Sequence, residues 1–190
     1  GGSLAGLDAI LNAGSFTRSR DYRIRTGDVI IDGPVESRIY RVAADSGSIT
    51  VSNAINASGI TGGVIDLKAN GSLIVGNGAL LNVSGMEFDA AGKGGSVTLE
   101  AGNQRNGTLD STALLDLRLG SVIDLSVAAK TPDSENFGRF SGTLHLRAPR
   151  NEANEDIQVA AIGSAINGAS SIMVEGVKLY GVTGTGSITE

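Results

Sequence analysis

Short apolar segments with an alternating pattern recur along this chain, and their repetition is the feature that most constrains its fold. Residues 62–85, GGVIDLKANGSLIVGNGALLNVSG, contain three such segments separated by Gly, Asn and Ser. Each segment is too short for a helix and alternates apolar with polar residues, which is typical of a strand that buries one face. We therefore interpret residues 62–85 as one unit of three strands that the chain repeats.

The three strands of this unit align with segments before and after it. The first strands are RIYRVAAD (38–45), GVIDLKAN (63–70), GSVTLEAG (95–102), GTLHLRAP (142–149) and SSIMVEGV (170–177). The second strands are GSITV (47–51), GSLIV (71–75), LLDLR (114–118) and IQVAA (157–161). The third strands are VIIDG (29–33), AINAS (54–58), LLNVS (80–84), VIDLS (122–126) and AINGA (165–169).

The spacing of equivalent residues supports this alignment, because the intervals lengthen where polar inserts occur. Tyr40 and Ile65 lie 25 residues apart, Ile65 and Val97 lie 32 apart, and Val97 and Leu144 lie 47 apart. The shortest interval suits three strands joined by tight turns, at roughly 3.3 Å per strand residue. Such inserts are typical of the edges of repeat proteins, and here they span residues 86–93, 103–112, 130–139 and 149–156.

These patterns predict an all-β fold, namely a right-handed single-stranded parallel β-helix, or β-solenoid, of about five coils. The inward residues of each first strand should stack on their equivalents one coil away, at a spacing of about 4.8 Å. These inward residues are Tyr40, Val42, Ala44, Ile65, Leu67, Ala69, Val97, Leu99, Ala101, Leu144, Leu146 and Ala148.

The first residues of the chain differ from the repeat. Residues 3–14 place Leu4, Leu7, Ile10 and Leu11 at helical spacing before Gly14. This pattern predicts a short helix that covers one end of the coils. We expect a single domain over residues 1–190, with a cap over 1–20 and coils with inserted loops over 21–190.

Two outward columns follow from the same alignment. In the first, opposite charges on neighbouring strands pair on a solvated face, at roughly 0.2–1 kcal/mol per pair. The second holds one amide or carboxylate from each third strand, and stacked amides form ladders. Calcium needs several carboxylate or carbonyl oxygens that converge, so a mostly neutral column argues against a metal row. The first column is Lys68, Glu100, Arg147 and Glu175, and the second is Asp32, Asn56, Asn82, Asp124 and Asn167.

Residues that carry enzyme chemistry are sparse. The one His of the chain, His145, should face outward, with Thr98 and Asp66 as neighbours in its column. A nucleophilic triad needs a His held by a carboxylate next to Ser or Cys, so we interpret His145 as a surface residue. The sequence predicts no catalytic residue, no cofactor and no metal ion.

Polysaccharide lyases and glycoside hydrolases also use β-helices and are the enzymatic alternative. They need two carboxylates at a set separation, or acidic metal ligands beside a basic residue. One insert joins charged groups to aromatic rings and is the candidate ligand-contact loop, although its two Phe also suit a role in covering the edge of a coil. Its residues are Asp133, Glu135, Phe137, Arg139 and Phe140.

Composition excludes several classes of protein. The net charge of −5 argues against a nucleic-acid surface, which needs clustered Lys and Arg. Cys does not occur, which excludes thiol chemistry and disulfides. No apolar run approaches the ~20 residues of a membrane helix.

The opening GGSLAG lacks the features of a secretory signal, so we expect a piece cut from a longer polypeptide. Candidate glycosylation sites are Asn56, Asn70, Asn82 and Asn106.

The repeated units resemble those of filamentous-haemagglutinin-type exoproteins, which are large bacterial adhesins exported by two-partner secretion. The resemblance rests on GGVIDLKANGSLIVGNGALLNVSG, GGSVTLEAG and AADSGSITVSNAINASGITGG, and it covers about residues 20–190. It implies a right-handed β-helical shaft, export through an outer-membrane transporter, and attachment to cells or matrix. The Asn-Pro-Asn motifs of the family's secretion domain do not occur in the chain, so the resemblance implies an interior piece of the shaft.

We therefore expect a structural and adhesive segment of a secreted or cell-surface haemagglutinin-like adhesin, and not an enzyme. A stiff rod would present the inserts at 86–93, 103–112 and 130–139 to glycans or proteins of host cells or matrix. The isolated fragment is expected to be a monomer. The alternatives are a carbohydrate-active β-helix enzyme and the shaft of a contact-dependent toxin.

Overall fold

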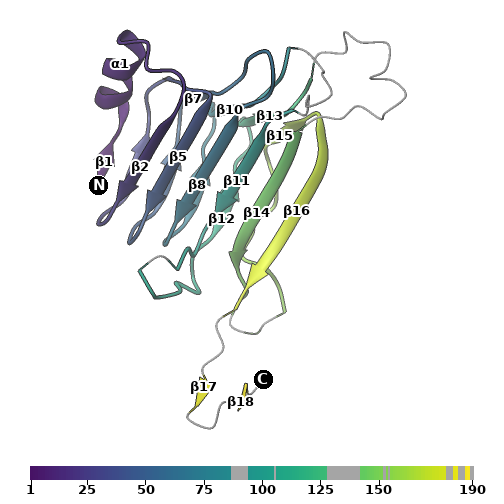
Figure 1. The fold of residues 1–190 in the computed structure, drawn as a ribbon. Helices are drawn as coiled ribbons and strands as arrows, with labels where there is room; N and C mark the ends of the chain where they lie inside the picture. Colours follow the sequence, from purple (N-terminus) through teal and green to yellow (C-terminus); the bar gives the residue numbers. More distant parts are fainter. Residues whose placement is uncertain are drawn as a thin grey trace.

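The computed structural model describes residues 1–86, 94–104, 106–127, 142–151, 153, 155–178, 182–183 and 187–188. Over these residues the fold is mostly β, with one short helix and three parallel sheets (Figure 1). The prediction of an all-β parallel fold is confirmed. Within the same residues, no helix has the length and apolar character needed to cross a membrane.

From β2 to β14, every third strand along the chain joins the same sheet. Sheet 1 holds β2 (Arg20–Ile24), β5 (Ile39–Ala44), β8 (Val64–Ala69), β11 (Ser96–Glu100), β14 (Gly142–Pro149) and β16 (Ala169–Val177). Sheet 2 holds β1 (Gly2–Ser3), β3 (Val29–Ile31), β6 (Ile49–Val51), β9 (Leu73–Val75) and β12 (Leu115–Leu117). Sheet 3 holds β4 (Val35–Glu36), β7 (Ala54–Asn56), β10 (Leu80–Asn82), β13 (Val122–Asp124) and β15 (Ala165–Asn167). A separate antiparallel pair joins β17 (Val182–Thr183) to β18 (Ser187–Ile188).

Equivalent residues of sheet 1 pair as predicted. Ile65 aligns with Tyr40 on one side and with Val97 on the other, and Val97 aligns with Leu144. All twelve predicted inward residues of these four strands are buried, with at most 2% of their surface exposed. The alternation of apolar and polar residues therefore decides which side of each strand faces the core.

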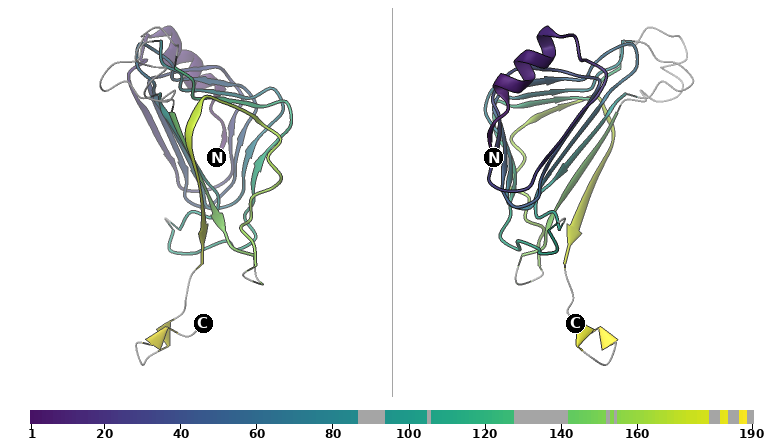
Figure 2. Two further views of the ribbon diagram at one scale, coloured as in Figure 1. Left: turned by 90° about the vertical axis from the view of Figure 1, so that its right-hand side faces the viewer. Right: turned by 60° about the vertical axis from the view of Figure 1, so that its left-hand side comes forward.

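The buried faces of the three sheets share one core (Figure 2). Its members are almost entirely Val, Ile, Leu and Ala, and Tyr40 is the one aromatic residue among the buried core residues described. Sheet 2 contributes residues such as Ile49 and Leu73, and sheet 3 contributes Ile55 and Leu81. Aliphatic side chains of similar size fill a narrow space between sheets without large gaps.

One predicted strand lies in a different sheet, because the interpretation of VIIDG as a third strand is wrong. The strand β3 from this segment pairs with β6, a second strand. The third-strand position belongs to β4, where Glu36 aligns with Asn56. Second and third strands share the same apolar-x-apolar pattern, so only the pairing partner distinguishes them. The strand β2 adds a sixth strand to sheet 1 before the five first strands that the alignment found.

The helix α1 (Ala5–Ala13) confirms the predicted N-terminal helix, with Gly14 as its C-cap. The prediction that the apolar residues of this helix cover the end of the coils is wrong for Leu7 and Ile10, which are 45% and 70% exposed. The buried side instead carries Asp8, which lies between the half-buried Leu4 and Leu11. The helix lies at the N-terminal end of the sheets (Figures 1 and 2). Polar contacts, and not the hydrophobic pattern, therefore decide which side of α1 is buried.

Candidate binding face on the six-stranded sheet

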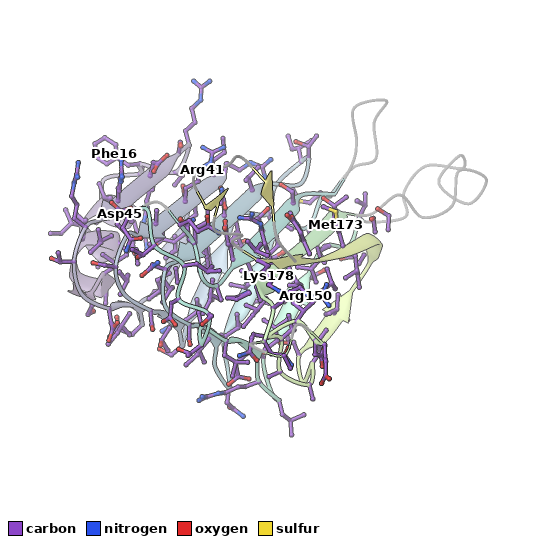
Figure 3. All side chains as sticks on the ribbon, turned by 90° about the horizontal axis from the view of Figure 1, so that it is seen from below. Phe16, Arg41, Asp45, Arg150, Met173 and Lys178 are labelled. Carbon is purple, nitrogen blue, oxygen red and sulfur yellow. The ribbon has the colours of Figure 1, made fainter. Side chains whose placement is uncertain are left out.

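The outer side of sheet 1 carries two columns of mostly polar residues, which we call the charged face. The first column is Asp21, Arg41, Asp66, Thr98, His145 and Met173. The second column is Arg23, Ala43, Lys68, Glu100, Arg147 and Glu175. The predicted column from Lys68 to Glu175 is thus confirmed. When the molecule is seen from below, Arg41 and Met173 lie on this outer side (Figure 3).

One end of the charged face is tied together by an ion-pair network. Arg147 donates hydrogen bonds to Glu100 and, at 3.1 Å from Nε to Oε1, to Glu175. The other carboxylate oxygen of Glu175 lies 3.0 Å from Nε2 of His145. Burial opposes the charge on Arg147, but the two carboxylates outweigh it and raise the pKa of its guanidinium above the usual range. The network joins β11, β14 and β16. Its Arg and Glu side chains are already paired with one another.

The other end of the charged face contains a small hollow in which charges are not fully paired. The hollow is lined by four charged residues and two apolar ones, namely Asp21, Arg41, Asp66, Lys68, Val42 and Ala43. Lys68 Nζ lies 3.1 Å from Asp66 Oδ2, whereas Asp66 Oδ1 is buried and has no hydrogen-bond partner among the described residues. No ion pair within the described chain joins Arg41 to its column neighbours Asp21 and Asp66.

An unsatisfied buried carboxylate oxygen costs about 1–3 kcal/mol. A ligand group that donates a hydrogen bond to Asp66 and accepts one from Arg41 or Lys68 would recover part of this cost. Hydroxyl and amide groups do both. The hollow therefore suits a neutral polar group better than a simple ion, because its two Asp and two basic side chains balance in charge.

His145 occupies the position that the sequence predicts. It aligns with Thr98, which in turn aligns with Asp66. The contact of His145 with Glu175 was not predicted, because Glu175 is not directly opposite His145 in the column. A residue on the next strand and two positions along also lies within reach of a long side chain, and this diagonal relation would have identified the pair.

The column of third-strand residues is confirmed except at its first member. Asp32 is outside it, because β3 belongs to sheet 2, and Glu36 takes its place beside Asn56. The side-chain oxygens of Asn56, Asn82 and Asp124 each accept a hydrogen bond from the backbone amide two residues later, at 3.2, 3.0 and 3.0 Å. These residues therefore close turns. In the described ranges, no three acidic or His side chains gather to hold a metal ion.

A buried polar cluster under α1 was not predicted. The carboxylate of Asp8, 1% exposed, accepts hydrogen bonds from Arg20, Tyr22 and Tyr40, all at 2.9 Å. Burial and the hydrogen bond to Asp8 raise the pKa of Tyr22 to about 12. Burial and the Asp8 charge also raise the pKa of Tyr40 well above its usual range. The signal in the sequence was the pair of Tyr residues facing inward on adjacent strands, which need a buried partner for their hydroxyls.

The structure describes only some of the predicted inserts. The candidate ligand-contact loop, with Asp133, Glu135, Phe137, Arg139 and Phe140, lies outside the described residues. The same holds for most of the insert at 86–93.

The insert at 103–112 is attached to the sheets by the side-chain amide of Asn70. This amide donates to the carbonyls of Asn103 and Thr108, at 2.7 and 3.0 Å. Within the insert, Asn106 accepts a hydrogen bond from the amide of Thr108 at 2.9 Å. Two of the four candidate glycosylation residues, Asn70 and Asn106, therefore use their side chains to shape this loop.

Comparison with protein-family models, curated proteins and solved structures found no match. The resemblance to haemagglutinin-type exoproteins therefore stays a prediction.

Proposed function

We propose that the chain is a structural and adhesive segment of a secreted or cell-surface bacterial adhesin of the filamentous-haemagglutinin type. Its three sheets would be the sides of a right-handed β-solenoid that serves as an interior piece of a longer shaft. The partners would be glycans or proteins of host cells or matrix, together with an outer-membrane transporter during export. The chain would act without a cofactor or catalytic residues, as a monomer when isolated, and would not bind nucleic acid.

The observation that carries this proposal is the alignment of sheet 1, which shifts register only between Gly142 and Thr143 among the pairs described. Six parallel strands keep inward residues beside inward residues, and outward beside outward, from Tyr22 in β2 to Val174 in β16. Such columns resist bending, because each strand is bonded along its length to its neighbours. They also place the charged face along the side of the stack, where a large partner can reach it. A protein of this form supports presentation of a surface better than closure around a small substrate.

The charged face is the part of this surface to test. The double variant Arg41→Gln/Lys68→Gln removes two positive charges beside the hollow and leaves the core intact. We expect it to reduce attachment of beads coated with the chain to cultured cells or matrix proteins severalfold. The matched control is Arg18→Gln/Arg118→Gln, which removes two exposed positive charges outside the charged face. Circular dichroism would verify that both variants are folded.

Two results would count against the proposal. Equal loss of attachment in both double variants would indicate non-specific charge attraction, and no attachment by the unmodified chain would remove the adhesive role. The proposal that the chain is not an enzyme is tested separately with acidic polysaccharides. Cleavage that disappears in Asp133→Asn/Glu135→Gln would establish the carbohydrate-active alternative.

A further inference from the structure

The two ends of the sheets differ in how they are covered. At the N-terminal end, α1 lies over the sheets and its Asp8 bonds to Tyr22 and Tyr40. At the other end, Ile172 and Val174 of β16 align with Leu144 and Leu146, which are 1% and 0% exposed. Ile172 and Val174 are nevertheless 49% and 47% exposed. They occupy inward positions that no further strand covers within the described part of the chain.

Sheet 2 shows where a further strand would bond. In β3, β6, β9 and β12 the first inward residue donates its amide to the carbonyl just before its partner on the next strand. The four bonds run from Val29 to Ser48, Ile49 to Ser72, Leu73 to Leu114 and Leu115 to Gln158, each at 2.9 Å.

Val159 is the next inward residue in this series, because it bridges to Leu115. Its amide instead donates to the carbonyl of Ile157, two residues away, at 2.7 Å. The series of bonds in sheet 2 therefore ends at Val159, which precedes β16 in the chain. Sheet 1 continues through β16 and is thus one strand longer at this end. A strand beside Val159 would continue the series.

The chain contains a segment with the sequence that this position needs. Residues 186–189 read Gly-Ser-Ile-Thr and repeat residues 47–50, which lead into β6. In β6, Ile49 is fully buried and Ser48 supplies the carbonyl of the series. Ser187 and Ile188 form β18, which pairs with β17 away from the three sheets (Figure 1). A two-stranded hairpin on its own is marginally stable in water.

The connection is long enough for this strand to reach the sheet. In the same corner of the fold, residues 70–72 join β8 to β9 and residues 101–114 join β11 to β12. Residues 178–186 separate β16 from β18, and their length lies between those of the other two connections. The spacing therefore allows the chain to pass from Ile172 in sheet 1 to Ile188 in sheet 2. An equivalent passage joins Tyr40 in sheet 1 to Ile49 in sheet 2.

We propose that Ser187 and Ile188 leave the hairpin and add to sheet 2 as a parallel strand beside Val159. The amide of Val159 then donates to the carbonyl of Ser187, and Ile188 turns toward the core. The chain thereby covers an edge that would otherwise pair with other polypeptides. This inference rests on the alignment of the sheets and not on the adhesive function.

A disulfide trap tests the proposal cleanly, because the chain has no Cys. The docked strand would place Ala160 beside Thr189 on the outward side, at one inter-strand spacing of about 4.8 Å. A disulfide spans Cα atoms about 4.4–6.8 Å apart. We therefore expect Ala160→Cys/Thr189→Cys to form an intramolecular disulfide in dilute, mildly oxidised full-length chain. The matched control is Thr50→Cys/Thr189→Cys, in which Thr50 lies four strand positions away and no such disulfide should form.

A third substitution separates docking from chance collision. Ile188→Asp, added to the Ala160→Cys/Thr189→Cys chain, should reduce the disulfide-bonded fraction about tenfold, because it places a charge at an apolar position. The same substitution alone should accelerate hydrogen exchange at the amide of Val159. The proposal is overturned if the trap forms no disulfide, if trap and control react equally, if Ile188→Asp changes neither readout, or if the disulfide joins two chains.

Discussion

Asp8 lies on the buried side of α1, where only 1% of its surface is exposed. It accepts hydrogen bonds from Arg20, Tyr22 and Tyr40. The guanidinium of Arg20 also donates to Asn12 and to the carbonyl of Glu36, so the cluster joins α1 to β2, β5 and β4. Removing one member of a buried ion pair leaves the other charged and unpaired, which costs more than the pair itself contributes.

At this residue scale we predict that Asp8→Asn lowers the free energy of unfolding by about 3–5 kcal/mol. The neutral amide keeps the size of the side chain but leaves the buried Arg20 without its counter-charge. Urea unfolding followed by circular dichroism would measure the change. The control is Asp116→Asn, whose partner Arg118 is 55% exposed, and its expected cost is about 0–1 kcal/mol. Equal costs for the two variants would show that the cluster does not hold the cap.

At the scale of elements, glycines at the start of the first strands allow neighbouring turns to approach closely. A Cβ on Gly95 would lie 2.2 Å from the carbonyl oxygen of Gly63 and 2.5 Å from Cβ of Val83. A Cβ on Gly142 would lie 2.2 Å from the carbonyl oxygen of Gly95. The glycines that open these strands are therefore required by packing between consecutive units.

Two glycine substitutions should change stability in opposite directions. Gly95→Ala should destabilise the fold by about 1–3 kcal/mol, because the clashes are with backbone and with the core. Gly6→Ala should stabilise it by up to about 1 kcal/mol, because Gly6 lies inside α1 with no atom near an added Cβ. Chemical denaturation of both variants would test the pair. A neutral Gly95→Ala would argue against close packing at this corner.

At the scale of the whole molecule, the two ends of the sheets should differ in local stability. The N-terminal end is covered by α1, whereas the inward Ile172 and Val174 of β16 are half exposed. Local opening follows the number of buried contacts that must be broken. Amides in β15 and β16 should therefore exchange with deuterium roughly 100-fold faster than those in β8 and β11. Uniform protection, measured by mass spectrometry, would show that the stack opens as one unit.

Most of the strands could be predicted, because the alternating pattern repeats often enough for most of them to be aligned with their equivalents. Ile65, Val97 and Leu144 pair as expected. The assignment of VIIDG failed because a short apolar-x-apolar segment fits two sheets equally well. The charged column from Lys68 to Glu175 was predicted, but the hollow beside Asp66 was not, because it depends on which pairs of side chains actually meet.

The sequence by itself determined most of the strands and the inward residues of the first strands, since burial of alternate side chains depends on local pattern. Only the tertiary structure decided the buried side of α1, where the hydroxyls of Tyr22 and Tyr40 and the charge of Arg20 converge on Asp8. Hydrophobic periodicity favoured Leu7 and Ile10 for that side. A buried carboxylate with three donors is stable only when residues distant in sequence surround it, so no local pattern could reveal it.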